Sequence, residues 1–175
     1  MNSDILVHSM KVADITKKIA EKMGLEEKAV IEIKIAAFFH DIGKEYIPKI
    51  ILNNPKKLTR DEFAIVKMHT KFGFRMLTQF DNNTMKTAAE VALNHHERYN
   101  GSGYSNKLNR EISLAARIVA VADVYDALIS ERVYQSALSI DEVLFYLKDN
   151  AGKLFDPSVV QALLNIKEGG LQYGT

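Results

Sequence analysis

The spacing of apolar residues constrains the fold of this chain more than any other feature. Over most of its length they recur every three or four positions, which matches the 3.6 residues per turn of an α-helix. No stretch sustains the alternation that is typical of a half-buried strand. With 175 residues, 47% of them hydrophobic, the chain is long enough to bury one core. We therefore predict an all-α fold, a single domain over residues 1–175 with about seven helices.

Capping and turn residues place the ends of these helices. Gly24 stands where the first helix would stop, and Thr59 to Glu62 and Ser139 to Glu142 each form a capping box. Asp156 followed by Pro157 is an N-cap with Pro at the first helical position. The segment from Pro48 to Pro55 is predicted to be a connection. The expected helices cover about residues 5–23, 26–43, 59–80, 88–95 and 114–129, and two more begin near 140 and 157.

Composition excludes several classes of protein. The net charge is +1 and no block of Lys or Arg stands out, so we expect no binding to long nucleic acids. The chain has no cysteine, which leaves His, Asp and Glu to hold any metal. No apolar run approaches the roughly 18 residues of a membrane span, and the first residues do not resemble a signal peptide. We expect a cytoplasmic protein without a membrane partner.

The histidines are the strongest candidates for a functional site. Three of the five continue the apolar stripe of their own helix and should point inward, and the remaining two stand next to Asp41 and His95; the set is His8, His40, His69, His95 and His96. A single inward histidine is more often an ordinary core residue. Burying several imidazoles without partners is costly, however, because each carries polar nitrogens. A shared metal cluster would satisfy all of them.

A carboxylate on the predicted helix 114–129 supports this interpretation. Asp123 lies on the inward stripe among small apolar residues, and a buried carboxylate needs a cation or strong donors. Asp126, one turn later, could share that role or simply form a hydrogen bond, and we favour the structural role. Ligation by His and Asp suits Fe, Mn, Zn, Co or Ni.

Four motifs together resemble a known family. His40-Asp41-Ile42-Gly43-Lys44 is similar to the signature of the HD superfamily of metal-dependent phosphohydrolases, and the stretch 95–104 resembles the second signature of its HD-GYP branch. The stretch 116–128 and Phe155-Asp156-Pro157 fit the same branch. The resemblance implies an HD-type helical domain and a phosphodiesterase that opens cyclic di-GMP to the linear dinucleotide and, in some members, to GMP.

The resemblance also implies a ligand set for two or three divalent transition-metal ions, with Fe or Mn favoured. One ion would be held by His8, His40, Asp41 and Asp123, and Asp41 would bridge to a second ion held by His69, His95 and His96. A hydroxide that bridges the two ions would attack the phosphodiester. Asp4 stands where some members carry a third-metal ligand, usually Glu, but it could equally be an exposed acid at a helix start.

Substrate contacts follow from the same resemblance. Lys44 would bind a non-bridging phosphate oxygen, and its alternative is a solvated cation at a helix end. Gly103 and Tyr104 would shape the nucleotide pocket. Arg132 would bind a phosphate, unless it is an ordinary surface residue. Glu97 would either support a metal-bound histidine or face solvent.

Two positions depart from the family pattern. Ser105 replaces the Pro of the second signature, and Gln135 replaces a cation near the second phosphate. They leave open an HD-type hydrolase of another cyclic dinucleotide or nucleotide. They also leave open a non-catalytic module that docks a signalling-protein partner through the loop from Gly101 to Ile112. A homodimer is compatible with the sequence, and the chain is either a stand-alone domain or a fragment.

Overall fold

The computed structural model describes residues 3–105, 107–130 and 137–167. Within these ranges the chain forms eight α-helices and two short 3-10 helices and no strand, which confirms the predicted all-α class. In chain order the elements are α1 (Ser3–Lys22), α2 (Glu27–Phe38), η1 (Ile42–Tyr46), α3 (Lys49–Leu52), α4 (Arg60–Leu77), α5 (Asn83–Asn94), η2 (Asn109–Glu111), α6 (Leu114–Ile129), α7 (Ile140–Asp149) and α8 (Pro157–Lys167).

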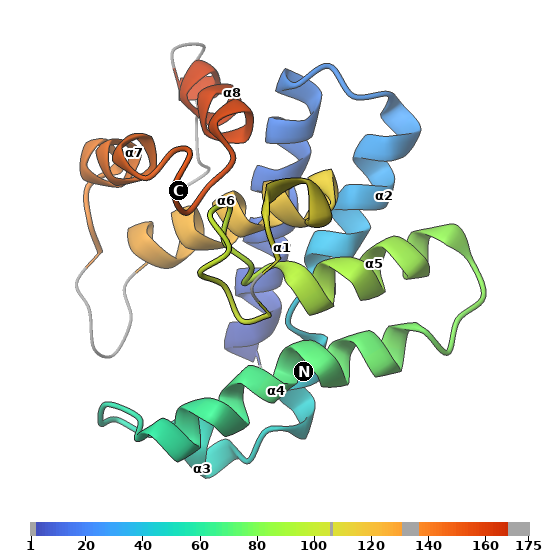
Figure 1. Cartoon of the computed structure of the whole chain (residues 1–175), viewed down its shortest axis with the longest axis vertical. Helices are drawn as coiled ribbons and strands as arrows, with labels where there is room; N and C mark the ends of the chain where they lie inside the picture. Colours follow the sequence, from blue (N-terminus) through green and yellow to red (C-terminus); the bar gives the residue numbers. More distant parts are fainter. Residues whose placement is uncertain (1–2, 106, 131–136, 168–175) are drawn as a thin grey trace.

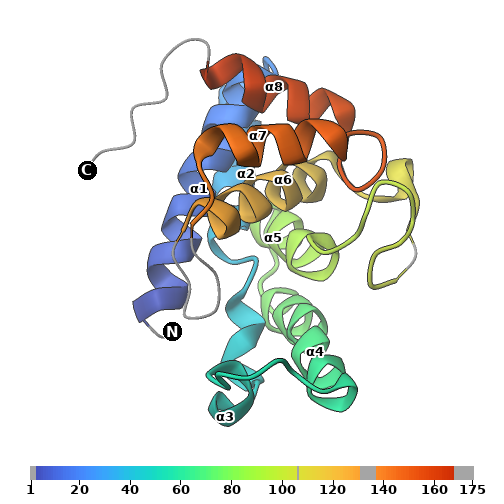
Figure 2. The ribbon, with the colours of Figure 1, turned by 90° about the vertical axis from the view of Figure 1, so that its left-hand side faces the viewer.

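The core lies where α1, α2, α5 and α6 meet (Figure 1). Helix α6 is buried on all sides along its middle, from Ile118 to Ala122, as expected for a helix that is apolar all round. Helices α7 and α8 pack beside α6, whereas α4, η1 and α3 form the opposite end of the molecule (Figure 2). No helix in the described part of the chain is long and apolar enough to span a membrane.

The predicted capping signals mark real helix starts. The Thr59 hydroxyl accepts a hydrogen bond from the Glu62 N–H, and the Glu62 carboxylate accepts one from the Thr59 N–H. Ser139 and Glu142 form the same box at the start of α7. Each box satisfies backbone donors that a helix start leaves unpaired.

The boundary of the second helix was predicted wrongly. Helix α2 ends at Phe38 instead of near residue 43, so that His40 and Asp41 lie in the turn before η1. The cause is a close contact between η1 and α4. A Cβ atom on Gly43 would lie 2.0 Å from the His69 carbonyl oxygen and 2.4 Å from the Gly73 nitrogen. The chain leaves the α2 helix and brings Gly43 directly onto the backbone of α4.

The segment after Pro48 was also predicted wrongly, as a connection. It contains the short helix α3, which accounts for the eighth helix. The Pro48 carbonyl accepts hydrogen bonds from the N–H groups of Ile51 and Leu52, and the fixed φ of proline suits a helix start. Helix α4 ends at Leu77 rather than near residue 80, and α5 begins at Asn83, capped by the Asn82 side chain.

Candidate metal centre

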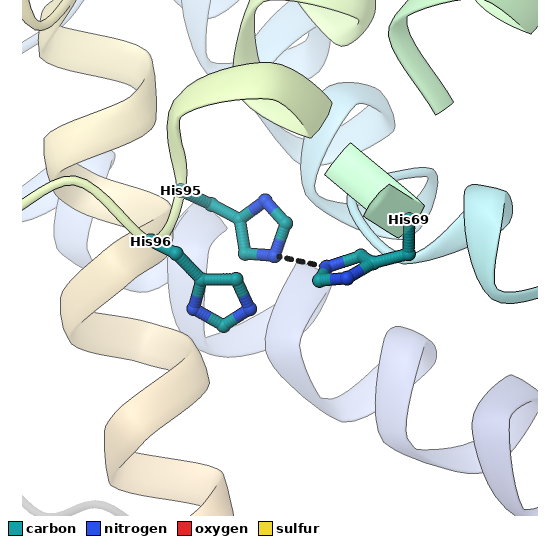
Figure 3. Close-up of side chains that lie close together, drawn as sticks. All are labelled: His69, His95 and His96. Atoms are coloured by element: carbon teal, nitrogen blue, oxygen red, sulfur yellow. Dashed lines mark hydrogen bonds between the residues drawn. The ribbon is translucent and has the colours of Figure 1, made fainter. Parts of the chain in front are cut away.

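Five separate segments bring their polar side chains to one interior point. The ligand candidates are His8 from α1, His40 and Asp41 from the turn after α2, His69 from α4, His95 and His96 from the end of α5, and Asp123 from α6. Figure 3 shows His95 and His96 pointing from the end of α5 toward His69. All the predicted metal ligands with described side chains therefore lie together.

Their ligand atoms fall into three overlapping groups, in each of which all atoms lie within 4.8 Å of one another. The groups are His69, His95 and His96; His8, His40 and Asp41; and His40, His95 and Asp123. The first two correspond to the two halves of the ligand set that the sequence implies. The third shows that the two halves adjoin each other.

Asp41 stands between the two halves, and its two oxygens face different histidines. Its Oδ2 atom lies 3.3 Å from the Nε2 of His40 and 4.0 Å from that of His8. Its Oδ1 atom lies 3.4 Å from the Nε2 of His69 and 3.8 Å from that of His95. A carboxylate in this position can give one oxygen to each of two cations.

Three of the imidazoles are oriented by hydrogen bonds to backbone carbonyls three or four residues earlier in the chain. The Nδ1 atom of His40 donates to the Ala37 carbonyl at 2.6 Å, and that of His69 donates to the Val66 carbonyl at 2.7 Å. The Nδ1 atom of His95 lies 3.1 Å from the carbonyls of both Val91 and Ala92. Because Nδ1 is the donor, Nε2 carries the lone pair toward the centre, which is the orientation that a metal ligand requires.

His8 is held by two carboxylates instead. Its Nε2 atom lies 3.1 Å from Asp123 Oδ1, and its Nδ1 atom donates to Asp126 Oδ2 at 2.7 Å. Burial disfavours the imidazolium, but the hydrogen bonds to Asp123 and Asp126 outweigh burial and raise the pKa of His8 to about 9. Asp126 is buried and belongs to none of the three ligand groups. It contacts the centre through His8.

The remaining charges of the centre suit a cation. Burial lowers the pKa of His69 and His95, and lowers that of His96 to about 4, so these rings are neutral near pH 7. Burial alone would raise the pKa of Asp41, but the Lys44 ammonium and His40 hold it well below its usual range. Burial alone would also raise the pKa of Asp123, but its hydrogen bond to His8 and the nearby His40 and His96 together lower it. Neutral imidazoles and ionised carboxylates are the protonation states that bind metals, and His8 would release its Nε2 proton when a metal binds.

Two buried atoms of the centre have no hydrogen-bond partner among the described residues: Nε2 of His40 and Oδ1 of Asp41. In addition, the Nε2 atoms of His69 and His95 face each other at 3.4 Å (Figure 3). Unsatisfied buried acceptors are costly, and divalent ions between these atoms would satisfy them. The donor set therefore fits a site for divalent metals.

Two of the predicted substrate contacts lie beside the centre. The Nζ atom of Lys44, on η1, donates to Asp41 Oδ2 at 2.5 Å. The Tyr104 ring packs on the His96 ring with centroids 4.8 Å apart and an interplanar angle of 37°. The predicted residues Arg132 and Gln135 lie outside the described residues, and so does the Asp4 side chain, although its backbone belongs to α1.

Gly103 and Glu97 have a packing role that the sequence did not reveal. Glu97 is 3% exposed, so it does not face solvent, which was one of the two roles expected for it. Its carboxylate accepts from the backbone N–H groups of Ser105 and Lys107 at 2.8 and 3.2 Å. A Cβ atom on Gly103 would lie 2.5 Å from the Glu97 Cα. Glycine thus lets the loop lie against Glu97, which fixes the position of Tyr104. No spacing in the sequence signals this contact.

A known protein family covers most of the chain. The model of the HD domain family matches residues 2–159. The chain belongs to the HD domain family, and the resemblance predicted from its motifs is confirmed.

Three curated relatives are similar to this chain over most of its length. The chain is 44% identical over 162 residues to a cyclic di-GMP phosphodiesterase of Thermotoga maritima, covering 92% of this chain and 44% of the relative. It is 46% identical over 155 residues to the cyclic di-GMP phosphodiesterase response regulator RpfG of Xanthomonas campestris pv. campestris, covering 88% and 41%. It is 37% identical over 158 residues to the 3'3'-cGAMP-specific phosphodiesterase 2 of Vibrio cholerae, covering 90% and 30%. The chain thus spans less than half the length of these curated relatives.

The fold is shared with the HDG"Y"P protein Bd1817 from Bdellovibrio bacteriovorus. The TM-score is 0.75 at 21% identity, and the match covers 94% of this chain and 53% of that one.

Proposed function

We propose that this chain is a metal-dependent phosphodiesterase domain that hydrolyses cyclic di-GMP to the linear dinucleotide. The observation that carries the proposal is the position of Asp41, whose two oxygens face two separate sets of imidazoles at 3.3 to 4.0 Å. A centre of this kind suits phosphodiester cleavage, because paired metals clamp both the attacking and the leaving oxygen. The names of the curated relatives support the cyclic dinucleotide as substrate.

We propose two ions, with Fe or Mn favoured and Zn, Ni or Co as alternatives, because a site of imidazole and carboxylate suits all of these metals. The first would be held by His8, His40, Asp41 and Asp123, and the second by Asp41, His69, His95 and His96. A third ion would depend on Asp4. When bound, the ions supply an activated water and neutralise charge on the phosphate.

The residues around the ions have separate tasks. Asp41 sets the spacing of the two halves, and Lys44, already 2.5 Å from Asp41 Oδ2, is in position to donate to a non-bridging phosphate oxygen. Tyr104 packs on the ring of His96. Arg132 is proposed to bind a phosphate, in which case Arg132→Ala would raise the KM.

The test combines metal analysis with hydrolysis. The protein is loaded anaerobically with Fe or Mn and incubated with cyclic di-GMP, 3'3'-cGAMP and cyclic di-AMP. We expect about two ions per chain and turnover of cyclic di-GMP. Metal-loaded protein that turns over none of the three dinucleotides would overturn the proposal. Preference for 3'3'-cGAMP would retain the chemistry and correct the substrate.

A pair of variants locates the activity. Asp41→Ala should abolish hydrolysis and lower the metal content, because both halves lose a shared ligand. Asp81→Asn changes a carboxylate whose side chain is 94% exposed and should change neither. Full metal content and full rate in Asp41→Ala would show that the centre is assigned wrongly.

A further inference from the structure

Helix α4 carries an exposed aromatic residue beside the metal centre that takes no part in the proposed metal chemistry. Phe63 continues the apolar stripe of its helix, yet it is 45% exposed. Its ring lies 6.2 Å from the Tyr104 ring, at an interplanar angle of 89°. The two rings therefore form an open corner rather than part of the core.

Tyr104 connects this corner to the centre. One side of its ring packs on His96, with centroids 4.8 Å apart, and Phe63 stands at its edge. A row of rings thus leads outward from the second set of metal ligands, through Tyr104, to Phe63. A nucleotide whose phosphate lies at the metals would extend its base along this row.

A cation completes the corner. Lys67 follows Phe63 by one helical turn, and its Nζ atom lies 5.5 Å from the Phe63 centroid and 5.7 Å from the Tyr104 centroid. Lys67 is partly buried. Among the described residues, no carboxylate lies within ion-pair distance of its ammonium, unlike that of Lys44. A lysine ammonium that lies over two rings without an acidic partner can bind an electron-rich group of a ligand.

We propose that Phe63, Lys67 and Tyr104 form a subsite for a guanine base of the cyclic dinucleotide, an inference that rests on the proposed function. Aromatic faces stack on any base. The cation distinguishes between bases, because guanine presents two adjacent acceptors, O6 and N7, whereas adenine places an amino donor beside its N7. Lys67 thus selects guanine over adenine, while Phe63 binds both purines.

The test for Lys67 is a change in base preference. Lys67→Met removes the charge and keeps an apolar stem. The kcat/KM ratio for cyclic di-GMP over cyclic di-AMP should fall by about tenfold, within the range for base readout by a charged side chain. The change in kcat/KM for 3'3'-cGAMP should lie between the changes for these two dinucleotides. Hydrolysis of bis(p-nitrophenyl) phosphate, which has no base, should change by less than about twofold.

Matched variants on the same helix serve as controls. Lys71→Met changes an exposed lysine one turn further along α4 and should leave the preference unaltered. Phe63→Leu should weaken both purine dinucleotides by about five- to tenfold, as expected for a lost stacking face, without altering their ratio. Phe74→Leu, at a residue of α4 that is 36% exposed, should weaken neither.

Direct binding of GMP and AMP to the metal-loaded protein, measured by calorimetry, separates the subsite from the reaction. If no dinucleotide is hydrolysed but GMP is preferred through Lys67, the subsite holds and the proposed function fails. If cyclic di-GMP is hydrolysed with the same base preference in Lys67→Met, the subsite is overturned and the proposed function holds. If there is neither turnover nor a preference for GMP, both are overturned.

Discussion

The Nδ1 atom of His8 donates a hydrogen bond of 2.7 Å to Oδ2 of Asp126, a residue 118 positions away in the chain. The other histidines with an assigned Nδ1 partner use a backbone carbonyl within their own segment. His8 is therefore oriented by a carboxylate from another helix. Such a carboxylate also raises the basicity of the ring as a ligand.

Replacing Asp126 should weaken metal binding without removing a ligand. For Asp126→Ala we expect a loss of about 10- to 100-fold in metal affinity, measured by competition with a chelator. Asp126→Asn keeps an acceptor and should lose less. Asp14→Asn, at an exposed residue of the same α1 helix as His8, is the control. Equal affinity in Asp126→Ala and the wild type would refute this role.

Gly43→Ala should disrupt the approach of η1 to α4. The added methyl group would lie 2.0 Å from the His69 carbonyl oxygen. Because this oxygen belongs to the backbone of α4, it cannot rotate away as the end of a side chain could. We expect a loss of about 3 kcal/mol in the free energy of unfolding, together with reduced metal content, because Asp41 and His69 move apart.

Gly24→Ala is the comparison for that variant. Its Cβ would meet nothing within 4 Å, but its φ of +77° should cost about 1–2 kcal/mol. Urea unfolding and elemental analysis measure both variants. If Gly43→Ala bound metal as well as Gly24→Ala, the close contact would not be needed to assemble the centre.

Ser105→Pro should loosen the loop that carries Tyr104. Proline has no N–H group, so the 2.8 Å hydrogen bond to Glu97 is lost, and of the two backbone hydrogen bonds from described residues the one from Lys107 remains. A net loss of about 1 kcal/mol corresponds to roughly fivefold faster hydrogen exchange at the Lys107 amide. Ser105→Ala keeps the N–H and should exchange like the wild type. Equal exchange in the two variants would show that this hydrogen bond does not hold the loop in place.

Asp156→Ala should destabilise the protein in a pH-dependent way. Asp156 accepts hydrogen bonds from the N–H and hydroxyl of Ser158 and pairs with Arg117. Burial would raise the pKa of Asp156, but these partners lower it from 3.8. We expect a loss of about 1–2 kcal/mol at pH 7, measured by urea unfolding.

The sign of the pH effect follows from the lowered pKa. Stabilisation by Asp156 is fully present above the pKa that its carboxyl group has in the unfolded chain, near 4. It is lost as the pH falls through the lower pKa of the same group in the folded protein. The difference between wild type and Asp156→Ala should therefore shrink below pH 4. A difference that stays constant from pH 7 to pH 3 would contradict this account.

Features that depend on local sequence could be predicted. Helix α6 covers Leu114–Ile129 as expected, because its apolar run and its boundaries lie in neighbouring residues. The inward direction of His69 and His95 followed from helical periodicity, and both are 1% exposed. The capping boxes at Thr59 and Ser139 involve residues only three apart.

Features that depend on contacts between distant segments could not be predicted from the sequence. The end of α2 is decided by Gly43 against the backbone of α4, and helical periodicity alone runs on past it. The apolar stripe of α4 suggests that Phe63 is buried, but the stripe reaches the rim of the molecule, where Phe63 meets Tyr104. The role of Glu97 depends on a loop that folds back eight and ten residues later.

The ligand candidates extend from His8 to Asp123 and come from five segments that span most of the described chain. Metal ions bound there would act as cross-links that close long loops, whose entropy the unfolded chain otherwise retains. Binding energy at such a site is also folding energy. Metal availability would therefore set the lifetime of the folded protein as well as its activity, and a cell short of metal would lose the protein itself.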